Sequence, residues 1–220
     1  MLLALATLEG IASLPCSAQA SDPVRTKEAV VAAQMLELEL PVQGLTSENA
    51  EGVRADLAAL QIQVHRCQAC RKEAAEPGNC PGCKAPLEPV TRSLFTEVAP
   101  SAKTNVVALT PDPLAIVKLS QLEAALGKRS VRIDDEQFKL TGRAQLLVAC
   151  PPTEASAVEK ALTDAKLFAE VKIAEPAASP LVLTVRAGPK PPTRAQVKAA
   201  LQGAKAQLAD VVWRPLPARS

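Results

Sequence analysis

Four of the six cysteines in the chain lie close together in two matched pairs. Cys67 and Cys70 form one Cys-x-x-Cys pair, and Cys80 and Cys83 form a second one after a short spacer. Two residues between the thiols let both sulfurs turn toward one centre, and four thiolates in a tetrahedron bind Zn²⁺ with Zn–S distances of about 2.3 Å. We therefore predict one Zn²⁺ at these four residues. Because four protein ligands fill the coordination shell, the predicted site is structural rather than catalytic.

Two disulfides, a thiol redox pair or another metal are the alternatives for the same four residues. A redox Cys-x-x-Cys normally opens a helix of a thioredoxin-like unit, and the sequence around these pairs does not indicate one. Four thiolates around Zn²⁺ leave a charge of about −2, which neighbouring basic side chains can offset. Those side chains are Arg66, Arg71, Lys72 and Lys84.

Two other residues with ligand chemistry are expected to play lesser parts. His65, the only histidine, lies two positions before Cys67 and is expected beside the site or on the surface rather than as a ligand. Cys150 stands alone and is expected to be a small buried hydrophobic residue. With one histidine and no phosphate-binding or dinucleotide-binding glycine pattern, the sequence indicates no catalytic constellation, so we predict a protein that is not an enzyme.

The composition of the chain argues against nucleic acid and membrane as partners. A net charge of +2 and an aromatic content of 2% supply neither the electrostatic footprint nor the stacking surface for nucleic acid. No segment reaches the roughly 18 apolar residues of a membrane-spanning helix. The expected partners are therefore a metal ion and another protein, with no nucleic acid and no membrane span.

The first residues resemble an export signal. An apolar run from Met1 leads to Ala18-Gln19-Ala20, an A-x-A cleavage pattern, although Glu9 interrupts the run and no basic residue precedes it. We predict a signal peptide over residues 1–20, with cleavage after Ala20, and a polar spacer over 21–32. The predicted location is the periplasm or the extracellular space.

The hydrophobic patterns predict an α+β fold made of two β-α-β-β-α-β units, each with two helices on one face of a four-stranded antiparallel sheet, the ferredoxin-like arrangement. The first domain spans 33–140 and includes the metal-binding module over 65–90, inserted between the two central strands. The second domain spans 141–217. The expected strands are 36–40, 61–64, 105–109 and 131–133 in the first unit and 145–149, 169–174, 181–185 and 210–213 in the second. The expected helix caps are Thr46 or Ser47, Ser120, Thr153 and Thr193.

The cysteine segment resembles the short heavy-metal-binding domain found beside bacterial heavy-metal efflux components. Pro77-Gly78-Asn79-Cys80-Pro81-Gly82-Cys83 and Leu87-Glu88-Pro89 match that pattern in order and spacing. Cys70 stands where the family has histidine, and Ala69 and Ala85 replace its methionines. The loss of the thioethers removes soft ligands that favour Cu(I).

The flanking units resemble heavy-metal-associated domains, the copper-chaperone-like family whose Gly-Met-Thr-Cys-x-x-Cys loop holds the metal. Here Ser47 and Ala50 stand where the two thiols would be, and the second unit offers only Cys150. The resemblance implies degenerate domains without a Cu(I) site, the first carrying a zinc ribbon-like insertion. We thus predict a non-enzymatic metal-binding protein. The alternatives are an interaction or regulatory module that uses zinc only for stability, and a copper or zinc chaperone linked to efflux.

Overall fold

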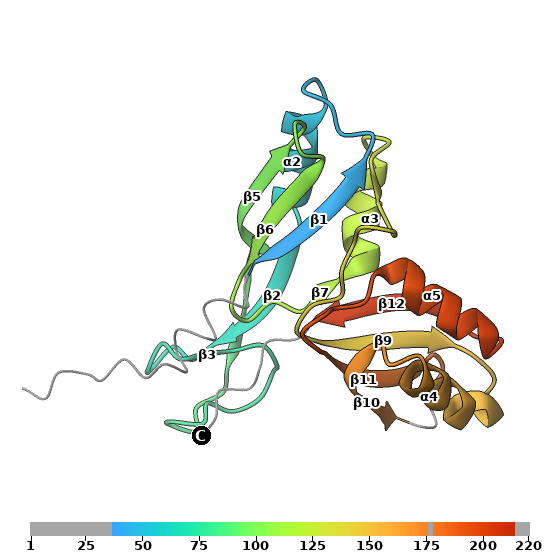
Figure 1. Ribbon diagram of the computed structural model, residues 1–220. Helices are drawn as coiled ribbons and strands as arrows, with labels where there is room; N and C mark the ends of the chain where they lie inside the picture. Colours follow the sequence, from blue (N-terminus) through green and yellow to red (C-terminus); the bar gives the residue numbers. More distant parts are fainter. Residues whose placement is uncertain (1–36, 176–177, 214–220) are drawn as a thin grey trace, which may run out of the picture.

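A computed structural model describes residues 37–175 and 178–213, shown as coloured ribbons in Figure 1. The predicted signal peptide over 1–20 and the spacer over 21–32 lie outside these residues. The described part is a mixed α+β fold of four helices and three sheets, which confirms the expected class and is consistent with a ferredoxin-like fold. Among the described residues, no helix is long and apolar enough to cross a membrane.

The first sheet has four antiparallel strands in the order β5-β6-β1-β8. Strand β1 lies near its predicted position, and its leucines and Val42 alternate inward, giving one buried face. After β1 the chain turns at Gly44, whose positive φ of 84° and approach to the Ser130 carbonyl leave no room for a side chain. The strands are β1 (Leu38–Gln43), β5 (Phe95–Ser101), β6 (Val106–Pro111) and β8 (Arg132–Ile133).

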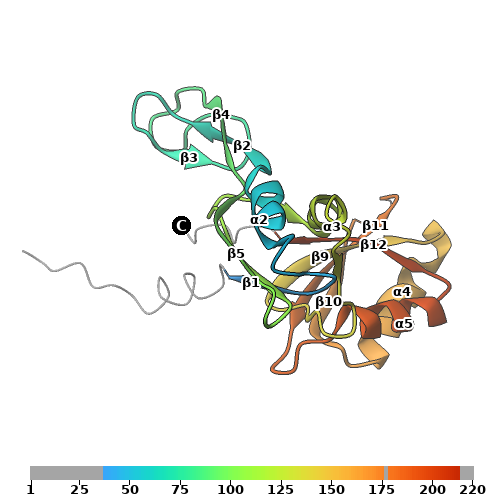
Figure 2. The same ribbon diagram turned by 90° about the horizontal axis from the view of Figure 1, so that it is seen from above.

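The predicted second strand belongs to a different sheet, which corrects the expected insertion point. Strand β2 (Gln61–Arg66) pairs with β4 (Glu88–Ser93) and with the short β3 (Glu73–Ala74), not with β1 or β6. We call residues 61–93 the arm; it projects from the rest of the molecule in both views (Figures 1 and 2). The place of the second strand in the first sheet is taken by β5, so the arm is inserted between the first helix and β5.

The second sheet repeats the strand order of the first, as β10-β11-β9-β12, and adds β7 at the edge beside β12. Because β7 comes from the first half of the chain, this sheet contains residues from both halves. Its strands are β7 (Val117–Lys118), β9 (Arg143–Ala149), β10 (Phe168–Glu175), β11 (Leu181–Ala187) and β12 (Gln207–Trp213).

Helices cover one face of each sheet and close a continuous hydrophobic core. Helices α2 (Ala50–Ala58) and α3 (Leu119–Gly127) pack together in the first half. In the second half, a 3₁₀ turn (Pro152–Glu154) leads into α4 (Ala155–Asp164). Helix α4 packs against α5 (Arg194–Gly203). The buried leucines and valines of both halves, apart from Val64 and Val212, belong to one cluster.

Only one of the expected helix caps is confirmed as a cap. The Thr193 side chain accepts a hydrogen bond from the Gln196 N–H, and the Gln196 side chain accepts one from the Thr193 N–H, which forms a capping box. Ser120 is the second residue of α3, and its hydroxyl donates to Asp210 on β12, 2.6 Å away. Thr46 lies in the turn before α2, and the N-cap of α4 is Glu154 in place of Thr153.

Candidate metal centre

Two turns of the same backbone design form the outer end of the arm. In the first, the Cys67 N–H donates to the Lys72 carbonyl and the Arg71 N–H donates to the Cys67 carbonyl, both at 2.8 Å. In the second turn, the Cys80 N–H donates to the Ala85 carbonyl at 2.8 Å, and the Lys84 N–H donates to the Cys80 carbonyl at 2.9 Å. The residue after each second cysteine is left-handed, with φ of 59° at Arg71 and 62° at Lys84. We call each Cys-x-x-Cys turn a knuckle.

The two knuckles bring all four predicted ligands together. Their Sγ atoms lie within 4.8 Å of one another. The closest contacts run between the knuckles: Cys67 to Cys83 and Cys70 to Cys80 are both 3.3 Å, and Cys70 to Cys83 is 3.8 Å. Four sulfurs placed about 2.3 Å from one zinc ion would be about 3.8 Å apart. The cluster therefore has the size of a tetrahedral four-thiolate metal site.

Burial divides the four cysteines into two kinds. The first cysteine of each knuckle, Cys67 or Cys80, is fully buried, whereas the second, Cys70 or Cys83, is exposed. This division follows from how each turn lies against the arm, with its first cysteine on the inside and its second cysteine on the outside. One side of the cluster is thus closed by the arm and the other side is open to solvent.

Backbone amides favour the thiolate form of the two buried cysteines. The Cys70 N–H, and after it the Cys83 side chain, lower the pKa of Cys67. In the same way the Cys83 N–H, followed by the Cys70 side chain, lowers the pKa of Cys80 to about 6. A hydrogen bond donated to sulfur stabilises its negative charge, and metal ligands must be thiolates.

The exposed cysteines hold their protons more tightly. The Lys72 N–H acts to lower the pKa of Cys70, but hydrogen bonds with neighbouring thiols, Cys80 first, outweigh it and raise that pKa to about 12. The pKa of Cys83 is also raised: the Ala85 N–H acts in the opposite direction but is outweighed by a neighbouring thiol and by burial. Without a metal, protons on the cluster are therefore held mainly by the two exposed cysteines, which share them with the buried sulfurs through hydrogen bonds.

The flanking basic residues differ in their surroundings. The Lys72 Nζ atom lies 3.0 Å from where a Cβ on Gly82 would be, so this ammonium reaches across to the second knuckle and depends on a glycine there. Arg66 instead binds Glu73 on β3, with Nε 2.6 Å from the carboxylate. Glu73 also binds Arg92 of β4, which in turn lies 3.2 Å from Asp112. This ion-pair chain, which the sequence did not reveal, joins the three strands of the arm to its base.

The remaining candidate residues lie outside the cluster. His65 is 9% exposed and pairs with Ala74 and Pro89 in the arm sheet, and its Nδ1 atom has no hydrogen-bond partner. Cys150 packs against the core at the end of β9, and burial, with a smaller effect of Glu154, raises the pKa of its thiol. Ser47 and Ala50 lie at the start of α2 and not in the arm.

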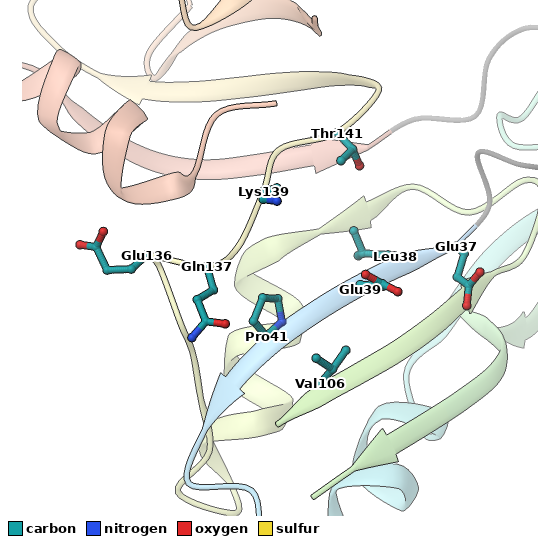
Figure 3. A pocket seen from close by; sticks show the side chains of 9 residues that line it. All are labelled: Glu37, Leu38, Glu39, Pro41, Val106, Glu136, Gln137, Lys139 and Thr141. Atoms are coloured by element: carbon teal, nitrogen blue, oxygen red, sulfur yellow. The ribbon is translucent and has the colours of Figure 1, made fainter. Parts of the chain in front are cut away.

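A cleft of about 650 Å³ lies on the open face of the first sheet, beside residues 136–141 (Figure 3). Its apolar lining residues are Leu38, Pro41 and Val106. Its charged side chains are three carboxylates and one ammonium, from Glu37, Glu39, Glu136 and Lys139. The lining contains no cysteine or histidine, so the cleft lacks the soft donors of the arm and the metal centre remains the stronger candidate site.

Comparisons with known proteins yield one distant likeness. No protein-family model matches the sequence, and no curated protein matches it. The structure is similar to that of the water-soluble region of the P-type ATPase CopA from Bacillus subtilis, with a TM-score of 0.29 and 15% sequence identity over 79% of this chain and 90% of that chain. A TM-score this low supports no argument about function.

Proposed function

We propose that this chain is a non-enzymatic metal-binding protein that holds one Zn²⁺ in a structural site at Cys67, Cys70, Cys80 and Cys83. One observation carries the proposal: two knuckles of matching backbone geometry place four Sγ atoms within 4.8 Å of one another. Cysteine clusters of this size and ligand number are typical of zinc. Zinc at this position would make the arm a zinc ribbon-like module.

Zinc suits the ligand set better than copper does. Cu(I) favours few soft ligands, whereas a set of four thiolates in a tetrahedron is the common structural zinc site. The charge of about −2 on such a site is partly offset by Lys72, whose ammonium lies beside the second knuckle. The loop before α2, where a copper chaperone would hold its metal, offers Ser47 and Ala50 and therefore no thiolate.

The rest of the chain serves, on this proposal, as a scaffold that carries the arm. The repeated strand order, β5-β6-β1-β8 and β10-β11-β9-β12, supports two ferredoxin-like units related to heavy-metal-associated domains. Export to the periplasm or beyond, with cleavage after Ala20, completes the proposal and rests on the apolar run from Met1 and the A-x-A pattern that follows it.

Metal analysis of freshly purified, reduced protein tests the zinc assignment. Native mass spectrometry should show one zinc per chain. Cys80→Ser should abolish binding because it removes a buried ligand, whereas the matched control Cys150→Ser should keep one zinc. Protein isolated without any metal, or a Cys150→Ser variant that loses it, would contradict the proposal.

Exposure of Cys70 and Cys83 favours a second candidate, a carrier that passes its metal to another protein. An incoming thiolate can reach the metal only on the open side, where these two ligands could leave one at a time. A carrier would transfer its zinc to a small dithiol chelator within minutes in a reaction that is first order in chelator. A structural site would instead release zinc at a rate independent of chelator, set by opening of the arm.

A further inference from the structure

Each exposed cysteine of the metal centre has a buried cysteine of the other knuckle as its close neighbour. The Sγ of exposed Cys83 lies 3.3 Å from that of buried Cys67, and the Sγ of exposed Cys70 lies 3.3 Å from that of buried Cys80. This arrangement places a sulfur on an exposed residue next to a sulfur on a buried residue. Such a pair has the parts of a redox-sensitive dithiol: an accessible sulfur that an oxidant can reach and a second sulfur beside it that can resolve the oxidised one.

We propose that hydrogen peroxide opens the metal centre by forming two disulfides between the knuckles, Cys67–Cys83 and Cys70–Cys80. The inference rests on the proposed function, since it supposes a metal held by these four sulfurs. It adds a regulated release of that metal by an oxidant. Reduction by a dithiol would restore the four ligands.

The chemistry balances for each pair. The Cys83 sulfur attacks one oxygen of the peroxide, an S–O bond forms and the O–O bond breaks. Hydroxide departs, and Cys83 becomes a sulfenic acid. The Cys67 sulfur then attacks the sulfenic sulfur, the S–S bond forms, and a second hydroxide leaves. Two solvent protons convert the hydroxides to water. The two sulfurs have lost two electrons and the peroxide has gained two; Cys70 and Cys80 react in the same way.

The pairing across the knuckles has a consequence for the arm. Each disulfide joins the first knuckle to the second, so the outer end of the arm stays closed after the metal has left. Disulfides within the knuckles, Cys67–Cys70 and Cys80–Cys83, would leave the two turns unconnected. The pairing pattern therefore decides whether oxidation preserves the arm or releases its end.

Tryptic mapping of the metal-loaded full chain separates the two patterns. Cleavage after Arg66 and Arg71 leaves Cys67 and Cys70 in one peptide, and cleavage after Lys72 and Lys84 leaves Cys80 and Cys83 in another. After treatment with about two equivalents of peroxide, we expect loss of the bound metal and a single product in which the two peptides are joined. Fragmentation between the cysteines should then assign Cys67–Cys83 and Cys70–Cys80, and Cys150→Ser should behave identically.

Several outcomes overturn the inference. Two separate peptides with internal disulfides would contradict the pairing, and so would sulfinic or sulfonic acids in place of disulfides. Metal retained after the disulfides form would contradict the release. If the reduced chain holds no metal before peroxide is added, the proposed function fails instead, and metal analysis of the untreated sample distinguishes the two cases.

Discussion

The four cysteines of the metal centre differ in how readily they give up a proton. Backbone amides of each knuckle point at the first cysteine, and for Cys80 they hold the pKa at about 6. The second cysteines also accept a hydrogen bond from a backbone amide, but hydrogen bonds with neighbouring thiols outweigh it, and the pKa of Cys70 rises to about 12. A metal ion thus meets a partly ionised site, and its affinity depends on the protons that it must still displace.

This difference predicts the proton release on zinc binding. At pH 7.5, Cys80 is already ionised, whereas Cys70 and Cys83, with raised pKa values, still carry protons. Binding should release about two to three protons instead of four, and zinc affinity should rise with pH by the same power. Calorimetry in buffers of different ionisation enthalpy measures this number. Release of four protons would show that the amides do not preform the buried thiolates.

The clustering of the four cysteines was predictable from the sequence because it is local. A Cys-x-x-Cys turn brings its two sulfurs together through hydrogen bonds inside six residues, and the structure reproduces that turn at Cys67 and at Cys80. The division into buried and exposed cysteines was not predictable. It depends on how the turns lie against the arm, which the spacing of the cysteines does not contain.

At the scale of elements, the arm is a small sheet with almost no core of its own. Its buried side chains are Val64, His65, Cys67 and Cys80. Leu94, fully buried at the base, ties the returning chain to the hydrophobic core, and its N–H donates to the Leu60 carbonyl at 2.7 Å. Apolar burial therefore contributes little to the stability of the arm, which must come from its ion pairs and, on the proposed function, from the bound metal.

The assignment of residues 61–64 to the first sheet was wrong because two neighbouring strands, β4 and β5, were not recognised in the sequence. Strands β4 and β5 contain Pro89 and Pro100, which are tolerated because both strands lie at sheet edges, but which mask the strand signal. Without β4 and β5, the pattern over 61–64 looked like the second strand of the first unit. Pairing between distant segments, here Gln61 with Ser93, is not encoded in the local pattern.

Glu73 is the residue on which the ion pairs of the arm converge. Arg92 first, and then Arg66, hold the pKa of its carboxyl at about 2. A depressed pKa contributes stability above the ordinary value of 4.5, and that contribution is lost only as the pH falls toward 2. Glu73→Gln should therefore speed amide exchange in β2 and β4 at pH 7 by an amount corresponding to ~1 kcal/mol.

The matched control for this change is Glu51→Gln, which removes a pair between Glu51 and Arg54 on the exposed surface of α2. That variant should leave amide exchange in the arm unchanged. Equal exchange rates in the Glu73 variant and the wild type would mean that the carboxylate does not tie β3 to its neighbours.

Removal of the metal should unfold the arm alone. Binding of zinc to small cysteine-rich modules contributes roughly 10 to 16 kcal/mol to the folded form, and the arm has little else to replace it. Amides of β2, β3 and β4 should lose their protection from exchange after chelation. Amides of β1 and β6 should keep theirs, because no arm strand belongs to the first sheet. Loss of protection at Leu40 as well as Val64 would contradict this separation.

At the scale of the whole molecule, the two sheets with their helices, which form the body that carries the arm, are joined by more than a linker. Strand β7 extends the second sheet, and Asp210 of β12 accepts hydrogen bonds from the backbone and hydroxyl of Ser120 on α3. The Phe138 and Trp213 rings meet edge to face, with centroids 6.1 Å apart. The sequence predicted two domains from a repeated pattern, but it carried no sign of how closely they pack, because these contacts join residues far apart in the chain.

Arg194 is the charged residue at the centre of this junction. It begins α5 in the second half, is 8% exposed, and its Nη1 atom binds Asp135 at 3.0 Å and also Glu123 of α3. Asp135 binds Lys198 as well. The guanidinium therefore binds two acidic side chains from the first half, and one of them, Asp135, has Lys198 as a second cationic partner.

Arg194→Ala should destabilise both halves together. Loss of the guanidinium leaves Glu123 beside a partly buried gap and Asp135 with Lys198 alone, which should lower the free energy of unfolding by about 2 to 3 kcal/mol. Because the core is continuous, amides of β6 and of β11 should lose protection by the same amount. The matched control, Arg129→Ala, removes an arginine that is 46% exposed and binds Asp56 within the first half, and should cost less than about 1 kcal/mol. If Arg194→Ala weakens β11 while β6 keeps its protection, the halves unfold independently, and the junction is a contact between two domains rather than the middle of one cooperative body.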